Sequence, residues 1–172
     1  MKIALLGGTF NPVHSGHLLI AQIAMDSYSL DKVVFVPAGR PPHKKSPRTS
    51  ALDRLAMLRL AVRKNPAFAV SDWEIRQGRV VYTWETLEQF HRMYPKASLF
   101  FIIGSDSLKT LPDWKKPERL RRLCRFIAIP RIDPFSGTEI RRRVRNGRSV
   151  RYRVPDAVEQ YIRKRRLYRR PE

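Results

Sequence analysis

Residues 2–29 of the chain read KIALLGGTFNPVHSGHLLIAQIAMDSYS, and this stretch decides the fold. The apolar run from Lys2 to Leu6 predicts a short buried strand, which Gly7 and Gly8 end. The residues from His17 to Ser29 are largely apolar and predict a helix. The sequence therefore opens with a strand, a glycine-containing turn and a helix.

Further strands and helices alternate along the rest of the chain. Three more apolar runs predict strands, at Val33–Val36, Leu99–Ile103 and Arg125–Ile129, and Phe68–Val70 is predicted to begin a further one. Apolar residues at helical spacing lie between them, around Leu58 and around Phe90. Strands that are apolar throughout and separated by helices are typical of a parallel sheet covered on both faces. We therefore predict an α/β fold with a doubly wound, mostly parallel, five-stranded sheet of the Rossmann-like kind.

Two helices are predicted after the last strand. The first, Ser136–Arg145, begins with a Ser-x-x-Glu capping box formed by Ser136 and Glu139, and the second spans Pro155–Lys164. A length of 172 residues favours a single domain. We expect residues 1–134 to form the core sheet with its helices and residues 135–172 to form a C-terminal helical segment.

The composition excludes several classes of protein. The longest uncharged run, Ile3–Met25, contains histidines, polar residues and glycines, so we expect no membrane span. The single cysteine, Cys124, excludes an internal disulfide and an all-cysteine metal site, which suits the cytoplasm. We therefore expect a cytoplasmic protein without a membrane partner.

The charge is strongly positive. The chain has 35 Lys and Arg against 15 Asp and Glu, a net charge of +20, and residues 115–172 contribute +14 of it. Such an excess attracts nucleotides or nucleic acid. It is equally consistent with a solvated, arginine-rich surface that has no specific partner.

Three loops are predicted to meet at one edge of the sheet. They follow the first, second and fourth strands and contain Gly7-Gly8, Pro37-Ala38-Gly39 and Gly104-Ser105-Asp106. Ligands of open parallel sheets bind at this edge, beyond the carboxyl ends of the strands. The first loop continues to a helix start that carries His14 and His17 on either side of Gly16. Both imidazoles could face one phosphoryl group there, although a hydrogen-bonded core histidine is the ordinary alternative for each.

The segment Gly-Gly-Thr-Phe-Asn-Pro-Val-His-Ser-Gly-His resembles the opening of the bacterial nicotinate-nucleotide adenylyltransferases, within the nucleotidyltransferase superfamily whose signature is His-x-Gly-His. Four further segments are similar to that family and keep its order: Arg40–Lys44, Tyr82–Leu87, Phe101–Trp114 and Phe135–Arg141. The resemblance covers nearly the whole chain. It implies transfer of AMP from ATP to the phosphate of nicotinic acid mononucleotide, giving deamido-NAD and pyrophosphate.

The resemblance also implies the site residues. The catalytic candidates are His14, His17 and Arg141. The candidates for ATP binding are Gly8, Thr9, Phe10, Gly104, Asp106, Ser136 and Thr138, and those for mononucleotide binding are Lys44, Thr83, Trp114 and Arg131. The implied cofactor is Mg²⁺ carried with ATP, since no dedicated metal site is visible in the sequence.

The chemistry of this reaction suits these residues. The attacking phosphate monoester is largely a dianion at neutral pH, so no general base has to create the nucleophile. The site must instead align two phosphates and neutralise charge on the α-phosphate. His14 and His17 are candidate hydrogen-bond donors for that purpose.

The chain departs from the family at two places. Only the residues 130–135 separate the fifth strand from the Ser136 helix, where the family has roughly two to three dozen residues and a further strand. Six residues are too few for a parallel crossover. Gly137 also stands where family members usually have serine, which removes a hydroxyl group.

Alternatives to the adenylyltransferase hypothesis remain open. One is a related nucleotidyltransferase that acts on another phosphorylated acceptor. Another is a nucleic-acid-binding protein on a decayed transferase fold, although we otherwise expect nucleic acid to bind only by nonspecific electrostatic attraction. As for the oligomeric state, the sequence is compatible with a homo-oligomer.

Overall fold

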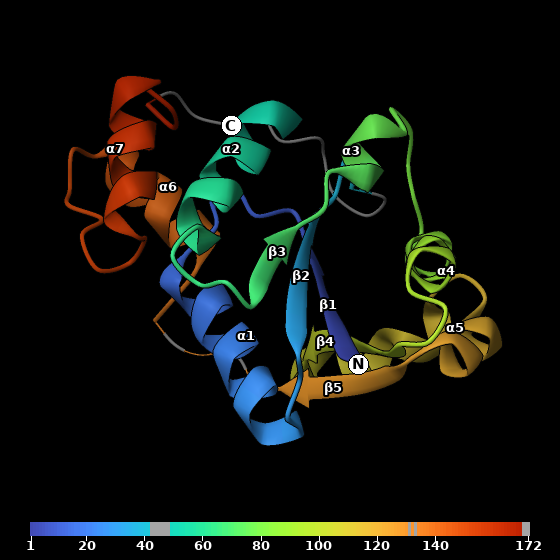
Figure 1. Ribbon diagram of the computed structural model, residues 1–172. Helices are drawn as coiled ribbons and strands as arrows, with labels where there is room; N and C mark the ends of the chain where they lie inside the picture. The colour runs from blue at the N-terminus through green and yellow to red at the C-terminus, as the bar shows by residue number, and fades with distance from the viewer. Residues whose placement is uncertain (42–48, 131, 133, 170–172) are drawn as a thin grey trace.

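The computed structural model describes residues 1–41, 49–130, 132 and 134–169. At its centre lies a five-stranded sheet with the order β3-β2-β1-β4-β5, and all four strand pairings are parallel (Figure 1). The strands are β1 (Lys2–Gly8), β2 (Lys32–Pro37), β3 (Phe68–Val70), β4 (Ser98–Gly104) and β5 (Arg125–Ile129). The structure therefore confirms the predicted five-stranded, doubly wound sheet.

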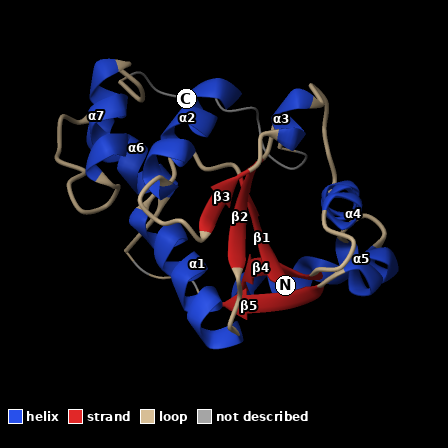
Figure 2. Cartoon of the chain, viewed as in Figure 1, coloured by secondary structure: helices blue, strands red, loops and turns tan. Residues whose placement is uncertain are grey.

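Helices cover both faces of the sheet (Figures 1 and 2). One face carries α1 (Ser15–Tyr28), α2 (Ala51–Val62), α6 (Gly137–Arg145) and α7 (Asp156–Lys164). The other face carries α4 (Thr83–Met93) and α5 (Pro117–Leu123). The short helix α3 (Trp73–Arg76) and the 3₁₀ helix η1 (Ser105–Asp113) lie in the connections after β3 and β4.

The apolar runs of the strands are buried because each face of the sheet has its own core. Ala4 and Leu6 of β1 pack with α1, α2 and the C-terminal helices, whereas Ile3 and Leu5 pack with α4 and α5. All four side chains are at most 7% exposed. Since burial of a large aliphatic side chain contributes about 1.5–3 kcal/mol, both faces of this central strand stabilise the fold.

The helix starts differ in detail from the sequence prediction. Helix α1 begins at Ser15, two residues before the predicted start, because His14 occupies its N-cap position. The predicted capping box of α6 forms only in part. The Ser136 hydroxyl accepts a hydrogen bond from the Glu139 N–H at 3.3 Å, but the Glu139 carboxylate accepts one from Arg142 at 2.8 Å.

Three elements were not predicted: α3, η1 and α5. Helix α3 has four residues, too few to show a periodicity. The 3₁₀ helix contains Pro112 and mostly polar side chains, which are typical of a loop in the sequence.

None of the helices in the described part of the chain combines the length and apolar character that a bilayer crossing needs.

Candidate active site

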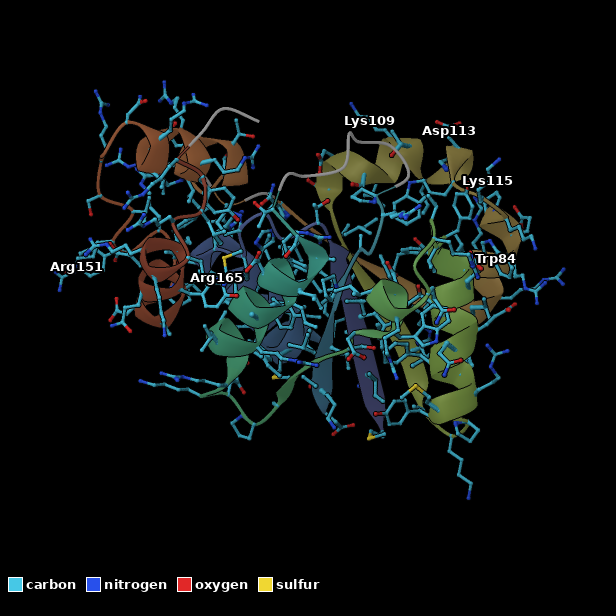
Figure 3. The ribbon with its side chains drawn as sticks, turned by 90° about the horizontal axis from the view of Figure 1, so that it is seen from above. Trp84, Lys109, Asp113, Lys115, Arg151 and Arg165 are labelled. Atoms are coloured by element: carbon cyan, nitrogen blue, oxygen red, sulfur yellow. The ribbon has the colours of Figure 1, made fainter. Side chains whose placement is uncertain are left out.

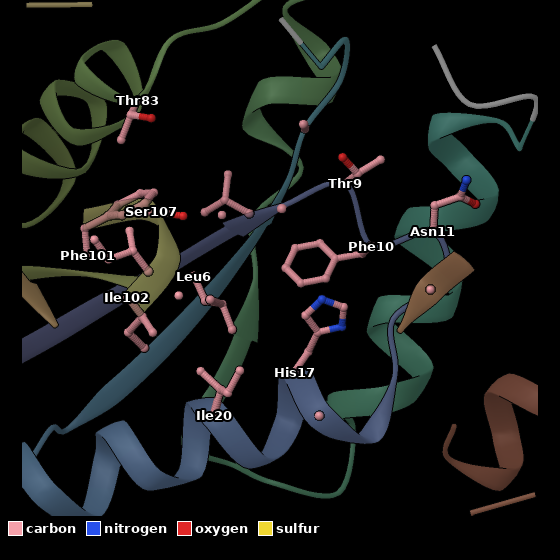
Figure 4. A pocket seen from close by; sticks show the side chains of 18 of the residues that line it. Leu6, Thr9, Phe10, Asn11, His17, Ile20, Thr83, Phe101, Ile102 and Ser107 are labelled. Atoms are coloured by element: carbon pink, nitrogen blue, oxygen red, sulfur yellow. The ribbon is translucent and has the colours of Figure 1, made fainter. Parts of the chain in front are cut away.

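One pocket of about 870 Å³ brings the candidate residues together at the carboxyl edge of the sheet (Figure 4). Its walls come from the β1–α1 loop, the end of β4 with η1, and the first turns of α4 and α6. Every candidate that the structure describes lines it: Gly8, Thr9, Phe10, His14, His17, Thr83, Gly104, Asp106, Trp114, Ser136, Thr138 and Arg141. The other two, Lys44 and Arg131, lie outside the described residues.

The two histidines of the His-x-Gly-His segment stack on each other at the start of α1. Their ring centroids are 3.6 Å apart and the ring planes differ by 23°. The backbone N–H of His14 donates to Nδ1 of His17 at 3.2 Å, so a neutral His17 carries its proton on Nε2. The ring of Phe10 packs edge-on against His17 at 4.9 Å, beside it in Figure 4. His17 is therefore held in one orientation, in which Nε2 is the ring nitrogen that can donate a hydrogen bond.

Burial keeps both imidazoles uncharged. Desolvation lowers the pKa of His14 from 6.5 to about 4. The pKa of His17 lies well below 6.5, because of desolvation and then because of the neighbouring His14. Without an anion in the pocket, both rings are neutral hydrogen-bonding groups at pH 7.

The first turn of α6 reaches the same pocket as the histidines, despite the short connection before it. Arg141 donates to the backbone oxygen of Asn11 in the β1–α1 loop at 2.7 Å. A Cβ atom at Gly137 would lie 3.0 Å from that same oxygen. Glycine therefore lets the helix start approach the loop closely, and Ser136 and Thr138 are placed on the pocket wall.

The opposite end of the pocket is formed by Thr83 and Trp114. Thr83 is the first residue of α4 and stands across the pocket from His17 in Figure 4. Trp114 follows η1 and packs edge-on against Phe101 and Phe126, with ring centroids 6.2 and 6.3 Å away. These contacts fix the orientation of a half-buried indole at the pocket wall.

Sequence reasoning did not identify Glu74 as a pocket residue. It belongs to α3, and its carboxylate accepts a hydrogen bond from the Thr86 hydroxyl at 2.6 Å. Burial is the main reason why the pKa of Glu74 rises from 4.5 to about 7. No sequence signal identifies this residue, because a glutamate in a short segment without a clear periodicity is normally expected to be solvated.

The described residues contain no cluster of three or more His, Cys, Asp or Glu side chains that could hold a metal ion.

The positively charged side chains are not confined to one part of the surface. In Figure 3, Arg151 and Arg165 lie at one end of the molecule, and Lys109 and Lys115 lie towards the other. Several arginines of the C-terminal segment form ion pairs with carboxylates: Arg142 with Glu139, Arg163 with Glu159, and Arg165 with Asp53. The first two pairs lie within one helix, and only the Arg165–Asp53 pair joins the C-terminal segment to α2.

Comparison with known proteins supports the family resemblance seen in the sequence. The sequence pattern of the cytidylyltransferase-like family matches residues 5–143. A relative from Synechococcus sp. (strain JA-2-3B'a(2-13)) is 42% identical, with 99% of this chain and 98% of its own length aligned. One from Thermus thermophilus is 43% identical, with 98% and 100% aligned. Both carry the name "probable nicotinate-nucleotide adenylyltransferase". The chain belongs to the nicotinate-nucleotide adenylyltransferase family.

Solved structures show the same fold as this adenylyltransferase family member. A crystal structure from Vibrio parahaemolyticus matches with a TM-score of 0.83 at 23% identity, covering 99% of this chain and 98% of the other. Plasmodium falciparum nicotinic acid mononucleotide adenylyltransferase complexed with NaAD matches with a TM-score of 0.78 at 16% identity, covering 98% and 97%. The Synechococcus alignment extends over 198 positions against 172 residues here, so the relative carries additional residues.

Proposed function

We propose that the protein transfers AMP from ATP to nicotinic acid mononucleotide, releasing pyrophosphate and forming deamido-NAD. The observation that carries this proposal is that one pocket has the stacked histidines and the α6 start at one end and Thr83 and Trp114 at the other. We assign the triphosphate of ATP to the first end and the flat pyridine ring of the acceptor to the second. The names of the full-length relatives support the same reaction.

The histidines would act as hydrogen-bond donors to the α-phosphate. Nε2–H of His17 is directed by the bond at Nδ1, so it is ready to donate without a change of tautomer. His14 stacks on it and would reach a neighbouring phosphate oxygen. Charge that develops on the α-phosphate is then stabilised by fixed dipoles. The mononucleotide phosphate attacks as a dianion, so these residues need not remove a proton.

The β- and γ-phosphates would lie at the N-terminus of α6. Free N–H groups and the positive end of a helix dipole favour anions there. Arg141 and the hydroxyls of Ser136 and Thr138 add donors on the same wall. We assign the adenosine to the end of β4, with Gly104 and Asp106, and the nearer phosphate to the backbone of Gly8, Thr9 and Phe10.

The acceptor would bind between Thr83 and Trp114. The indole of Trp114 offers a face for stacking on nicotinate, and N–H groups at the start of α4 favour a carboxylate over an amide. We assign Lys44 and Arg131 to the mononucleotide phosphate on the basis of the family resemblance.

Mg²⁺ would enter with ATP, bound by phosphate oxygens and water, as triphosphate substrates usually carry it. We place the reaction in the cytoplasm, where ATP is available.

Pyrophosphate release tests the proposal. The purified protein is incubated with Mg²⁺, ATP and one of three acceptors: nicotinic acid mononucleotide, nicotinamide mononucleotide or phosphopantetheine. We expect the first to react fastest, and His17→Ala to lower its turnover roughly 10²- to 10³-fold. The control, His91→Ala, changes a histidine of α4 that bonds the Leu123 carbonyl outside the pocket. A preference for phosphopantetheine, or full activity of His17→Ala, would refute the proposal.

A further inference from the structure

Arg54 is a buried cation that connects two loops of the pocket. It lies in α2 and is only 1% exposed. Its Nη1 donates to the backbone oxygen of Thr9 at 2.7 Å. Its Nη2 donates to the backbone oxygens of Ala38 at 2.8 Å and Gly39 at 3.2 Å. One guanidinium therefore joins the β1–α1 loop to the loop that follows β2.

The charge of Arg54 has no counter-ion in the described chain. The neighbouring Asp53 instead accepts hydrogen bonds from Tyr161 at 2.9 Å and Arg165 at 3.3 Å. Nε of Arg54 is buried and finds no partner among the described residues. A buried charge without an opposite charge costs several kcal/mol, so an anion bound next to it would gain from its presence. Desolvation is also the main reason why the pKa of Arg54 is lowered.

The hydrogen bonds of Arg54 also orient the peptide groups of the loops. In a planar trans peptide, the C=O of one residue and the N–H of the next point in opposite directions. Because the Thr9 carbonyl is held towards Arg54, the Phe10 N–H is directed away from it, and the same holds for the N–H of Gly39. Thr9, Phe10 and Ala38 all line the pocket. Arg54 therefore fixes the orientation of these peptide groups, with their N–H bonds on the side away from the guanidinium.

We propose that Arg54 is a positioning residue for ATP: it directs the N–H groups of these loops towards the phosphates and adds an attractive positive charge behind them. This inference rests on the proposed function, which places the phosphates of ATP at the β1–α1 loop. Arg54 does not line the pocket, so it acts through the loop backbone and through its field. A residue that only joins the loops would affect stability but would not distinguish ATP from the acceptor.

Calorimetric titration with ATP in the absence of acceptor tests the inference. The variants are Arg54→Met, which removes the charge and the donors, and Arg54→Lys, which keeps the charge but carries its donors on one nitrogen instead of the two that bond the separate loops. The matched control is Arg63→Met, at the exposed end of the same helix. We expect Arg54→Met to weaken ATP binding at least tenfold, as loss of a charged hydrogen-bonding group typically does, and Arg54→Lys to lie between it and the wild type.

Steady-state kinetics provides the selective readout. KM for ATP should rise at least tenfold in Arg54→Met, whereas KM for the mononucleotide should change by less than about threefold. If Arg54→Met does not fold, as circular dichroism would show, Arg54→Lys decides the question. Wild-type ATP affinity in a folded Arg54 variant, or an equal loss for both substrates, would overturn the inference. If the wild-type protein itself neither binds ATP nor releases pyrophosphate, the proposed function fails as well.

Discussion

Replacing Glu74 with glutamine should stabilise the protein at alkaline pH. The Glu74 carboxyl group is largely buried against α4, where it accepts the hydrogen bond from Thr86 at 2.6 Å. Burial raises its pKa from 4.5 to about 7, and the nearby charge of Glu85 contributes in the same direction. Glutamine keeps an acceptor oxygen for Thr86 and carries no charge. The variant therefore retains the contact but avoids burying an ionised group.

The magnitude follows from the difference in proton binding between the two states. Between about pH 4.5 and 7 the folded wild type keeps the Glu74 proton while the unfolded chain has lost it, so stability falls as the pH rises. Each unit of pKa difference corresponds to about 1.36 kcal/mol. The stabilisation by Glu74→Gln should therefore grow by about 2.5 kcal/mol between pH 5 and pH 8 and level off above that.

Urea unfolding at pH 5 and pH 8 measures this difference. Other groups, including the histidines, titrate alike in both proteins and cancel when the two free energies of unfolding are subtracted. Glu118→Gln, at an exposed carboxylate of α5, is the control and should show less than about 0.5 kcal/mol at either pH. An equal effect of Glu74→Gln at both pH values would refute the reasoning that burial holds this carboxyl protonated.

Three other perturbations have defined outcomes. The pKa of His14 is about 4 in the folded protein, so the wild-type free energy of unfolding should fall as the pH drops from 6.5 towards 4. Urea unfolding of His14→Asn should show a smaller fall over the same pH range, and a pH profile equal to that of the wild type would contradict this. Gly39→Ala would place a Cβ 2.6 Å from the backbone oxygen of Glu74, so thermal unfolding should report a loss of about 1–3 kcal/mol, and wild-type stability would show that the contact relaxes freely. Gly137→Ser restores the usual family hydroxyl but crowds the Asn11 oxygen at 3.0 Å, so KM for ATP should rise several-fold in initial-rate assays rather than fall.

The strands were predictable because, apart from a polar first residue in four of them, each is an uninterrupted run without polar side chains. The predicted bounds of β5 agree with the structure, the predicted start of β3 at Phe68 is correct, and β4 differs by one residue at each end. A strand buried on both faces needs no alternation, so a continuous apolar run between glycine or proline signals indicates it in the sequence. The convergence of the loops at one edge then follows from parallel pairing.

The polar residues that organise the pocket were not predictable from local patterns. An arginine such as Arg54 within a helix normally indicates a solvated surface, and its burial depends on a carbonyl 45 residues away in sequence. Glu74 is similar, because its partner Thr86 belongs to a different helix. For Gly137 the sequence suggested only a lost hydroxyl, whereas the structure shows a close approach to the Asn11 oxygen. Such contacts are set by tertiary packing.

A crystal structure of the protein with a non-hydrolysable ATP analogue tests the proposed chemistry most directly. We expect Nε2 of His17 to lie about 3 Å from an oxygen of the α-phosphate, with the other phosphates at the first turn of α6. An analogue bound elsewhere, or bound in the pocket with both imidazoles turned away from its phosphates, would contradict the proposal.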